Sequence, residues 1–414
     1  MHLNPVAPLT LLLLLLFGCG EKQDAPPTAR TLTTTAPPNI LIITADDLGW
    51  ADLDCYGSHL VESPHLDALA RNGVQFMHGY AAAPDGPGGR AGLQTGLAPD
   101  RMPRGLKPSH ETLGELARRS GYFTAYVGNW GMPGSPLQQG YDRSFAAGPP
   151  TRPDSFYYPF FINEPFPELA AAGGPGDYLT DVLTDRTLQL MEEWRGAPWL
   201  ISLNFYAPQV PIQGRRDWAT HYRELIANTH WRPFPTVEYA AMVSAIDANV
   251  GRLVDRLKQY NELDNTLIVF TSDNGGLHRR AEPDSLAPHT PPTNNGILRG
   301  GKGTLYEGGV RVPFIVHYPR GTTVTAASST PVIATDLYPT LAELFGRNDF
   351  SPSPDGRSLL PLLRGEELPP RTLRWQYQND TAERTGNVKT LVRNDSTFHY
   401  DLMASPDERV ELEE

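Results

Sequence analysis

Short runs of continuous apolar residues alternate with longer stretches of mixed polarity along most of this chain. Runs rich in β-branched and aromatic residues predict strands that are buried on both faces of a parallel sheet. They lie at 39–44, 122–127, 199–205, 266–271 and 312–317. The stretches with helical apolar spacing lie at 63–70, 112–119, 178–194 and 237–260. This alternation predicts an α/β fold in which helices sandwich a mainly parallel sheet.

The pattern changes after residue 320. One more helix is expected at 336–345, and a connection rich in proline and glycine follows it. Three short alternating segments then predict a small antiparallel sheet, at 373–377, 388–392 and 397–402. We therefore expect an α/β domain over residues 38–345 and a small C-terminal subdomain over residues 346–414.

The N-terminal residues have a pattern of their own. The leucine-rich run at 9–16 is too short to span a bilayer but has the size of a signal-peptide core. The following Leu-Phe-Gly-Cys resembles a bacterial lipobox with Cys19 as the lipidated residue, and an ordinary cleaved signal peptide is the alternative. We predict a lipoprotein signal peptide at 1–19 and a flexible tether at 20–37. The protein would then be exported, periplasmic or anchored at the outer membrane, and attached to the membrane through its lipid alone.

Composition narrows the partners of the protein. The 414 residues carry a formal net charge of −12, which argues against nucleic acid as a partner because phosphate neutralisation needs a basic face. With Cys19 assigned to the lipid, Cys55 is the one remaining cysteine, so we expect no intrachain disulfide and a buried thiol at Cys55. Nothing in the sequence indicates an oligomeric state.

Carboxylates follow two of the predicted strands at the point where each strand ends. Asp46 and Asp47 follow the first run, and Asp273 and Asn274 follow the run at 266–271. Open α/β sheets place their functional sites at the carboxyl ends of strands. Three carboxylates and an amide are hard oxygen donors, which suit a divalent cation, with calcium favoured over magnesium. The alternative is that these residues only cap a helix and form a turn.

One segment carries a more specific signal. Residues 83–96 read Ala-Pro-Asp-Gly-Pro-Gly-Gly-Arg-Ala-Gly-Leu-Gln-Thr-Gly. This segment resembles the active-site loop of type I sulfatases, in which Ala-Pro-x-Cys-x-Pro-Ser-Arg-Ala-x-Leu-x-Thr-Gly is usual. The resemblance extends from Pro38 to about Leu402 and is strongest over residues 298–313. It implies an alkaline-phosphatase-like fold, sulfate-ester hydrolysis, and calcium bound at the four strand-end positions.

The nucleophile position departs from that family. Counting back from Arg90, the cysteine that the family oxidises to formylglycine is Gly86. Gly88 and Gly89 stand at the following proline and serine positions, so the signal for that oxidation is missing as well. We therefore expect no formylglycine, and a glycine-rich loop that is either flexible or cradles an anion with its backbone amides.

The positions that face the sulfate in the family also differ. The usual Gly-Lys-Trp-His reads Gly-Asn129-Trp-Gly131 here, and the histidine that follows Ala-Pro is Gln209. Of the cationic set that the resemblance implies, only Arg90 and Lys302 remain. The role of Arg90 is then either to face the anion or to hold its loop onto the helix that follows.

These substitutions predict a pseudo-sulfatase that retains its divalent-metal site and binds an anionic glycan, sulfated glycans included. Loss of a covalent nucleophile costs on the order of a million-fold in turnover, and loss of a general acid or base roughly a hundred- to ten-thousand-fold. One alternative is an active hydrolase of sulfuric or phosphoric esters that uses a metal-bound water or, after a shift in register, Asp85. A second alternative is a structural envelope lipoprotein.

Overall fold

The computed structural model describes residues 36–149, 151–163, 165–227, 235–278, 291–349 and 352–412. The chain divides into two units, residues 1–36 and residues 37–414, and all described helices and strands belong to the second. The predicted signal peptide with Cys19 and nearly all of the predicted tether lie outside the described residues. Within the part that is described, no helix has the length and apolar character needed to cross a membrane.

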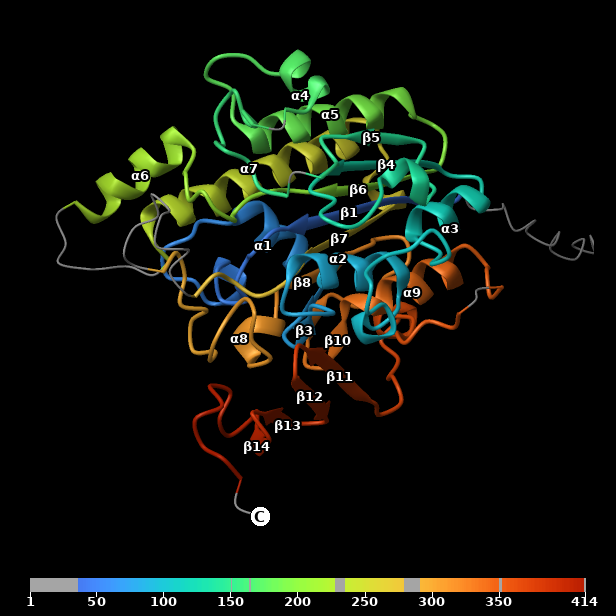
Figure 1. Ribbon diagram of the computed structural model, residues 1–414. Helices are drawn as coiled ribbons and strands as arrows, with labels where there is room; N and C mark the ends of the chain where they lie inside the picture. Colours follow the sequence, from blue (N-terminus) through green and yellow to red (C-terminus); the bar gives the residue numbers. More distant parts are fainter. Residues whose placement is uncertain are drawn as a thin grey trace, which may run out of the picture. The chain divides into compact units, whose positions relative to one another are not determined.

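An eight-stranded sheet forms the centre of the second unit, in the order β5-β4-β6-β1-β7-β8-β2-β9 (Figure 1). β8 alone runs against its neighbours, and the other pairings are parallel. The five strands predicted from sequence are confirmed as β1, β4, β6, β7 and β8. The bounds are β1 Asn39–Ala45, β2 Val74–Phe76, β4 Phe123–Gly128, β5 Arg143–Phe145, β6 Trp199–Asn204, β7 Thr266–Ser272, β8 Phe314–His317 and β9 Ala326–Ser328.

Helices cover both faces of this sheet (Figure 1). In β1, Leu41 and Ile43 belong to the apolar core that contains residues of α1, α5, α6 and α7. Ile40 and Ile42 point the other way, into the core that contains residues of α2, α3 and α9, because successive side chains of a strand face opposite sides. The bounds are α1 Pro64–Arg71, α2 Gly86–Thr95, α3 Leu113–Arg119, α5 Leu179–Glu193, α6 Arg216–Ile226, α7 Val237–Gln259 and α9 Leu337–Leu344.

A second, four-stranded antiparallel sheet follows in the order β11-β12-β13-β14, with β11 Thr372–Tyr377, β12 Asp380–Thr385, β13 Val388–Arg393 and β14 Ser396–Asp401. The small antiparallel sheet predicted from sequence is confirmed, but that prediction missed β12. In β12 the inward-facing residues are Ala382 and a fully buried Arg384. A buried arginine hides the apolar alternation by which strands are recognised.

The remaining elements are short. They are β3 Gly79–Tyr80, which pairs with β10 Val332–Ile333, and the helices α4 Pro167–Ala172, α8 Glu307–Val310 and α10 Leu360–Leu363. Five 3₁₀ turns are also described, at Asp54–Tyr56, Pro99–Arg101, Pro136–Gln139, Leu263–Asn265 and Ala334–Asp336.

A buried ion cluster attaches the C-terminal sheet to the α/β domain. The Nζ atom of Lys389, on β13, lies 2.9 Å from a carboxylate oxygen of Glu307 and 2.9 Å from one of Glu408, and all three side chains are fully buried. The second Glu307 oxygen accepts a hydrogen bond of 2.8 Å from the Tyr80 hydroxyl. Because an ion pair that has left water depends on both partners, Lys389 contributes strongly to the attachment of this sheet to α8.

We expect Lys389→Met to lower the free energy of unfolding by about 3–5 kcal/mol, since it removes the buried cation that Glu307 and Glu408 share. Glu307 keeps its 3.7 Å pair with Arg311. The matched control is Lys258→Met, which removes an exposed lysine from its 2.9 Å pair with Asp255 and should cost about 0.5 kcal/mol or less. Urea denaturation of both variants measures the difference. Equal unfolding midpoints would show that the cluster does not hold the sheet.

Candidate functional site

The register between β1 and β7 brings the predicted carboxylates together. Thr44 lies opposite Thr271 and Ala45 opposite Ser272, so both strands end at the same edge of the sheet. One oxygen each from Asp46, Asp47 and Asp273 lies within 4.8 Å of the others, and all three residues are buried. Asn274, also buried, donates from its amide nitrogen to Asp47 over 2.8 Å. We call these four residues the acidic cluster.

The glycine-rich segment is the first turn of α2, and the prediction of a loop there is wrong. Asp85 is the N-cap residue, and its carboxylate accepts a 2.8 Å hydrogen bond from the Gly88 N–H. The Gly89 N–H bonds to the Asp85 carbonyl at 2.9 Å, and Pro87 has no N–H. A capping carboxylate compensates for the glycines at a helix start. The amides of residues 87–89 therefore do not form an anion cradle.

Arg90 on α2 points into the acidic cluster. Its Nη1 atom contacts the Asp273 carboxylate directly and lies 3.3 Å from Oδ2 of Asp46. Its Nε–H donates to the carbonyl of Trp130 over 3.1 Å, and the residue is 4% exposed. This arrangement differs from both roles predicted for Arg90. The guanidinium pairs with two of the expected metal ligands.

Two glycines make room for that guanidinium. A Cβ atom at Gly86 would lie 2.7 Å from Nη2 of Arg90 and 2.9 Å from Oδ2 of Asp273. A Cβ at Gly131 would collide with the same Nη2, and φ at Gly131 is +56°, a conformation that favours glycine. The positions of the family's nucleophile and of one of its histidines therefore face a space that Arg90 fills.

Lys302 is the second cation of the site. Its Nζ lies 2.6 Å from Oδ1 of Asp47. Burial alone would lower the pKa of Lys302, but the three carboxylates of the acidic cluster raise that pKa above its ordinary value. Its side chain is 30% exposed, whereas that of Asp47 is 2% exposed. Lys302 is therefore where the cluster meets the surface.

The two amides that replace cationic residues of the family both bind Asp46. The Asn129 amide nitrogen contacts Oδ2 of Asp46 and donates to the Thr151 carbonyl over 3.0 Å. The Gln209 amide nitrogen donates to the same Oδ2 and to the same carbonyl, over 2.8 Å each. From sequence, these two positions are predicted only as lost cationic residues. The signal for their contacts is that both replacements are amides, which can donate to a carboxylate without adding charge.

The electrostatics of the acidic cluster fit a divalent cation. Burial raises the pKa of Asp46 well above its ordinary value, and the neighbouring Asp273 raises it further. Burial also raises the pKa of Asp273, against the effect of Arg90. Three carboxylates thus face only two cationic side chains. The buried Oδ1 atom of Asn274 has no hydrogen-bond partner among the described residues, and an oxygen of this kind suits a hard cation.

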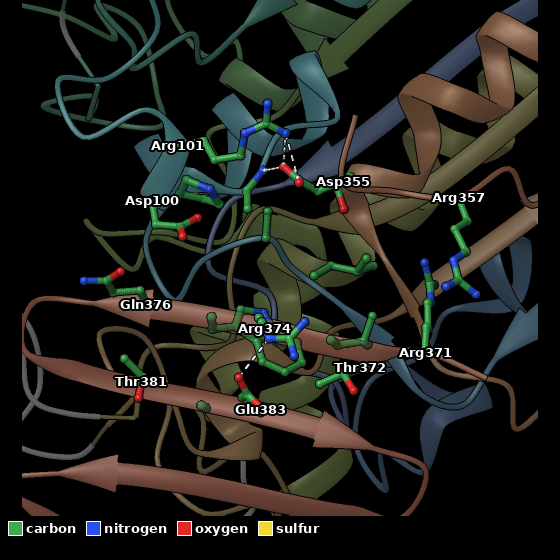
Figure 2. Close-up of a pocket in the computed structure, with 18 residues that line it drawn as sticks. Asp100, Arg101, Asp355, Arg357, Arg371, Thr372, Arg374, Gln376, Thr381 and Glu383 are labelled. Carbon is green, nitrogen blue, oxygen red and sulfur yellow. Dashed lines mark hydrogen bonds and ion pairs between the residues drawn. The ribbon is translucent and has the colours of Figure 1, made fainter. Parts of the chain in front are cut away.

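A cavity of about 530 Å³ opens beside β11 and β12, away from the acidic cluster (Figure 2). Arginines line it, but most of them already have carboxylate partners. Arg101 pairs with Asp355 at 2.9 Å, and Arg374 pairs with Glu383 at 2.8 Å. Arg371 pairs with Asp336, which does not line the cavity. Since these charges balance, the cavity has no marked preference for anions.

Comparisons with known proteins identify the family of this chain. The family model described as Sulfatase matches residues 38–347. Arylsulfatase A of Homo sapiens is 31% identical over 426 residues, which cover 91% of this chain and 79% of that protein. Steryl-sulfatase of Mus musculus is 30% identical over 434 residues, which cover 80% of this chain but only 65% of that protein.

Among solved structures, Ps i-CgsB in complex with k-i-k-neocarrahexaose is similar, with a TM-score of 0.77 and 28% identity over 91% of this chain and 88% of that one. The acidic cluster, Arg90 and Lys302 all fall inside the residues that the family model matches. Because that match covers well over half of the sequence, the chain belongs to the sulfatase family.

Proposed function

We propose that this protein is a non-hydrolytic sulfatase-family member that holds a divalent cation, calcium by preference, in the acidic cluster and binds an anionic glycan there. The observation that carries the proposal is the place of Arg90. Its guanidinium occupies the space into which side chains at Gly86 and Gly131 would extend. With no nucleophile at that point, the hydrolytic step loses on the order of a million-fold in rate.

Three features support retention of the cation. The carboxylates converge from two strand ends, and they outnumber the cationic side chains around them. The third is the buried Oδ1 atom of Asn274, which has no hydrogen-bond partner among the described residues. The resemblance to a structure that holds a neocarrahexaose supports a saccharide as the ligand. Lys302, whose side chain is partly exposed, supplies a cation that an anionic group of the saccharide can approach.

Asp85 is a weak candidate for a replacement nucleophile. Its carboxylate is engaged by the Gly88 N–H at the start of α2, where it stabilises the helix. The charged groups that mainly shift the pKa values of Asp46 and Asp273 include Arg90, Asp47 and Lys302. Asp85 is not among them. The carboxylate of Asp85 thus has a structural task that explains its presence.

Calcium binding tests the first half of the proposal. We expect isothermal titration calorimetry of residues 37–414 to show one calcium site, and Asp273→Asn to weaken it by at least about tenfold, equivalent to roughly 1.4 kcal/mol. Asp185→Asn is the matched control, because this exposed aspartate pairs with Arg252 on the surface. A wild-type protein that binds no calcium would remove the metal from the proposal.

Turnover tests the second half. We expect no hydrolysis of 4-nitrophenyl sulfate or 4-nitrophenyl phosphate above the uncatalysed rate, with or without calcium. Asp85→Asn keeps an N-cap residue and removes the alternative nucleophile, so activity lost in that variant would identify Asp85 as catalytic. Activity lost in Asp46→Ala but kept in Asp85→Asn would instead indicate metal-dependent hydrolysis, and either result would overturn the non-hydrolytic proposal.

A further inference from the structure

A groove of about 620 Å³ lies at the edge of the eight-stranded sheet opposite the acidic cluster. It is formed where β4 begins and where α3 and α5 end. Leu200 of β6 pairs with Ile40 of β1 on one side and with Thr124 of β4 on the other, so the starts of β4 and β1 are level. Asp46 comes six residues after Ile40. At about 3.3 Å per residue, the groove is roughly 20 Å from the acidic cluster along the strands.

An aromatic pair lines this groove. The rings of Phe123 and Trp194 stack, with 5.6 Å between their centroids and 13° between their planes. Trp194 is 5% exposed, whereas Phe123 is 47% exposed. A single exposed phenylalanine is common on protein surfaces. One that lines a concave groove and rests on a buried tryptophan has instead the character of the aromatic walls in small-molecule sites.

Three arginines line the same groove, namely Arg118, Arg143 and Arg195. Arg118 and Arg195 form no ion pair with a carboxylate in the described part of the chain. Arg195 stacks on the ring of Tyr260, with its guanidinium carbon 4.5 Å from the ring centroid. Arg143 lies 3.7 Å from Glu193, both side chains being about half exposed. The groove therefore holds guanidinium N–H donors that no carboxylate of the described chain takes up.

The two carboxylates of the groove do not balance these charges. Oδ2 of Asp142 accepts hydrogen bonds from the N–H and the hydroxyl of Thr124, over 3.0 and 2.9 Å. Glu193 is the partner of Arg143. Three guanidinium groups against two carboxylates leave one net positive charge, in a chain whose net charge is −12. A cation at a helix C-terminus complements the helix dipole, which explains Arg118 at the end of α3 but not the exposed ring beside it.

We propose that this groove is a second saccharide-binding site, which takes a sugar ring that carries a sulfate or carboxylate group. The apolar face of the sugar lies on Phe123. Arg118 and Arg195 supply the N–H donors for the anionic group, in the planar arrangement that guanidinium groups present to oxyanions. The choice of a glycan as the ligand rests on the proposed function, whereas the groove itself does not depend on the acidic cluster. The groove gives an anionic glycan a point of attachment remote from that cluster.

Calorimetry with glucose 6-sulfate tests this site, in residues 37–414, the unit that contains every described helix and strand. EDTA keeps divalent cations from the acidic cluster, whose carboxylates then outnumber its cationic side chains. We expect Arg118→Gln to weaken binding roughly tenfold, because it removes one charged hydrogen bond. Phe123→Leu should weaken it about two- to tenfold through loss of the ring face. Unsulfated glucose should bind at least about tenfold more weakly than the sulfate ester.

Arg119→Gln is the matched control. Arg119 follows Arg118 on α3 but does not line the groove, and it pairs with Glu111 and Asp349. Its substitution should leave the affinity for glucose 6-sulfate unchanged. An equal loss of affinity in Arg119→Gln and Arg118→Gln would show that general surface charge, and not the groove, attracts the sulfate ester, and would overturn the site.

The outcomes separate the groove from the proposed function. Binding that the double variant Phe123→Leu/Arg118→Gln retains in full, but Lys302→Gln loses, would overturn the groove and support the acidic cluster as the saccharide site. Binding lost in the groove variants and kept in Lys302→Gln would support the groove, whatever the acidic cluster binds. No binding of glucose 6-sulfate, with binding of phosphatidylglycerol–phosphatidylcholine vesicles that Arg118→Gln abolishes, would assign the groove to a membrane surface and overturn the saccharide.

Thermal unfolding guards against variants that lose binding because they lose the fold. Phe123→Leu keeps an apolar side chain over Trp194, and Arg118→Gln removes an exposed side chain, so both should unfold close to the wild-type temperature. In EDTA, glucose 6-sulfate should raise the melting temperature of the wild type and of Arg119→Gln, since it binds the folded state. An equal rise in Phe123→Leu/Arg118→Gln would contradict the second site.

Discussion

The contact between Arg90 and the carboxylates of Asp46 and Asp273 is the interaction on which the rest of the site depends. Aspartates brought together at the ends of β1 and β7 repel one another, and burial makes each charge costly. Arg90 and Lys302 offset most of that cost. The amide donors of Asn129 and Gln209 meet part of the remaining negative charge, at Oδ2 of Asp46.

The sequence was enough to predict the sheet and the acidic cluster. The runs that became β1 and β7 are uniformly apolar and end in carboxylates, and parallel strands bring such ends to one edge. It was not enough to predict where Arg90 points or that Asn129 and Gln209 share Asp46. Those contacts depend on tertiary placement. The same holds for β12, whose inward Arg384 contacts the Tyr80 hydroxyl and gives no apolar signal.

The helix at Gly86 shows a different limit. Four glycines between residues 86 and 92 are poor helix formers, each costing up to about 1 kcal/mol relative to alanine. The capping carboxylate of Asp85 and the ion pairs of Arg90 hold this helix against the sheet instead. Local propensity therefore predicts a loop. The ion pairs of Arg90, just after the first turn, favour the helix instead. In this segment the site helps to stabilise the fold.

Retention of the family's strongest motif does not by itself indicate retained chemistry. The segment 298–313 supplies Lys302, which pairs with Asp47 of the acidic cluster. Five residues later it supplies Glu307 to the ion cluster that attaches the C-terminal sheet. The backbone of Gly308 lies so close to Gly275 that a Cβ atom at position 275 would collide with the Gly308 carbonyl oxygen. A segment that binds the C-terminal sheet and pairs with Asp47 has structural reasons to keep its residues. The substituted positions, Gly86 and Gly131 above all, are therefore better evidence on whether the protein can hydrolyse esters than the motifs that remain.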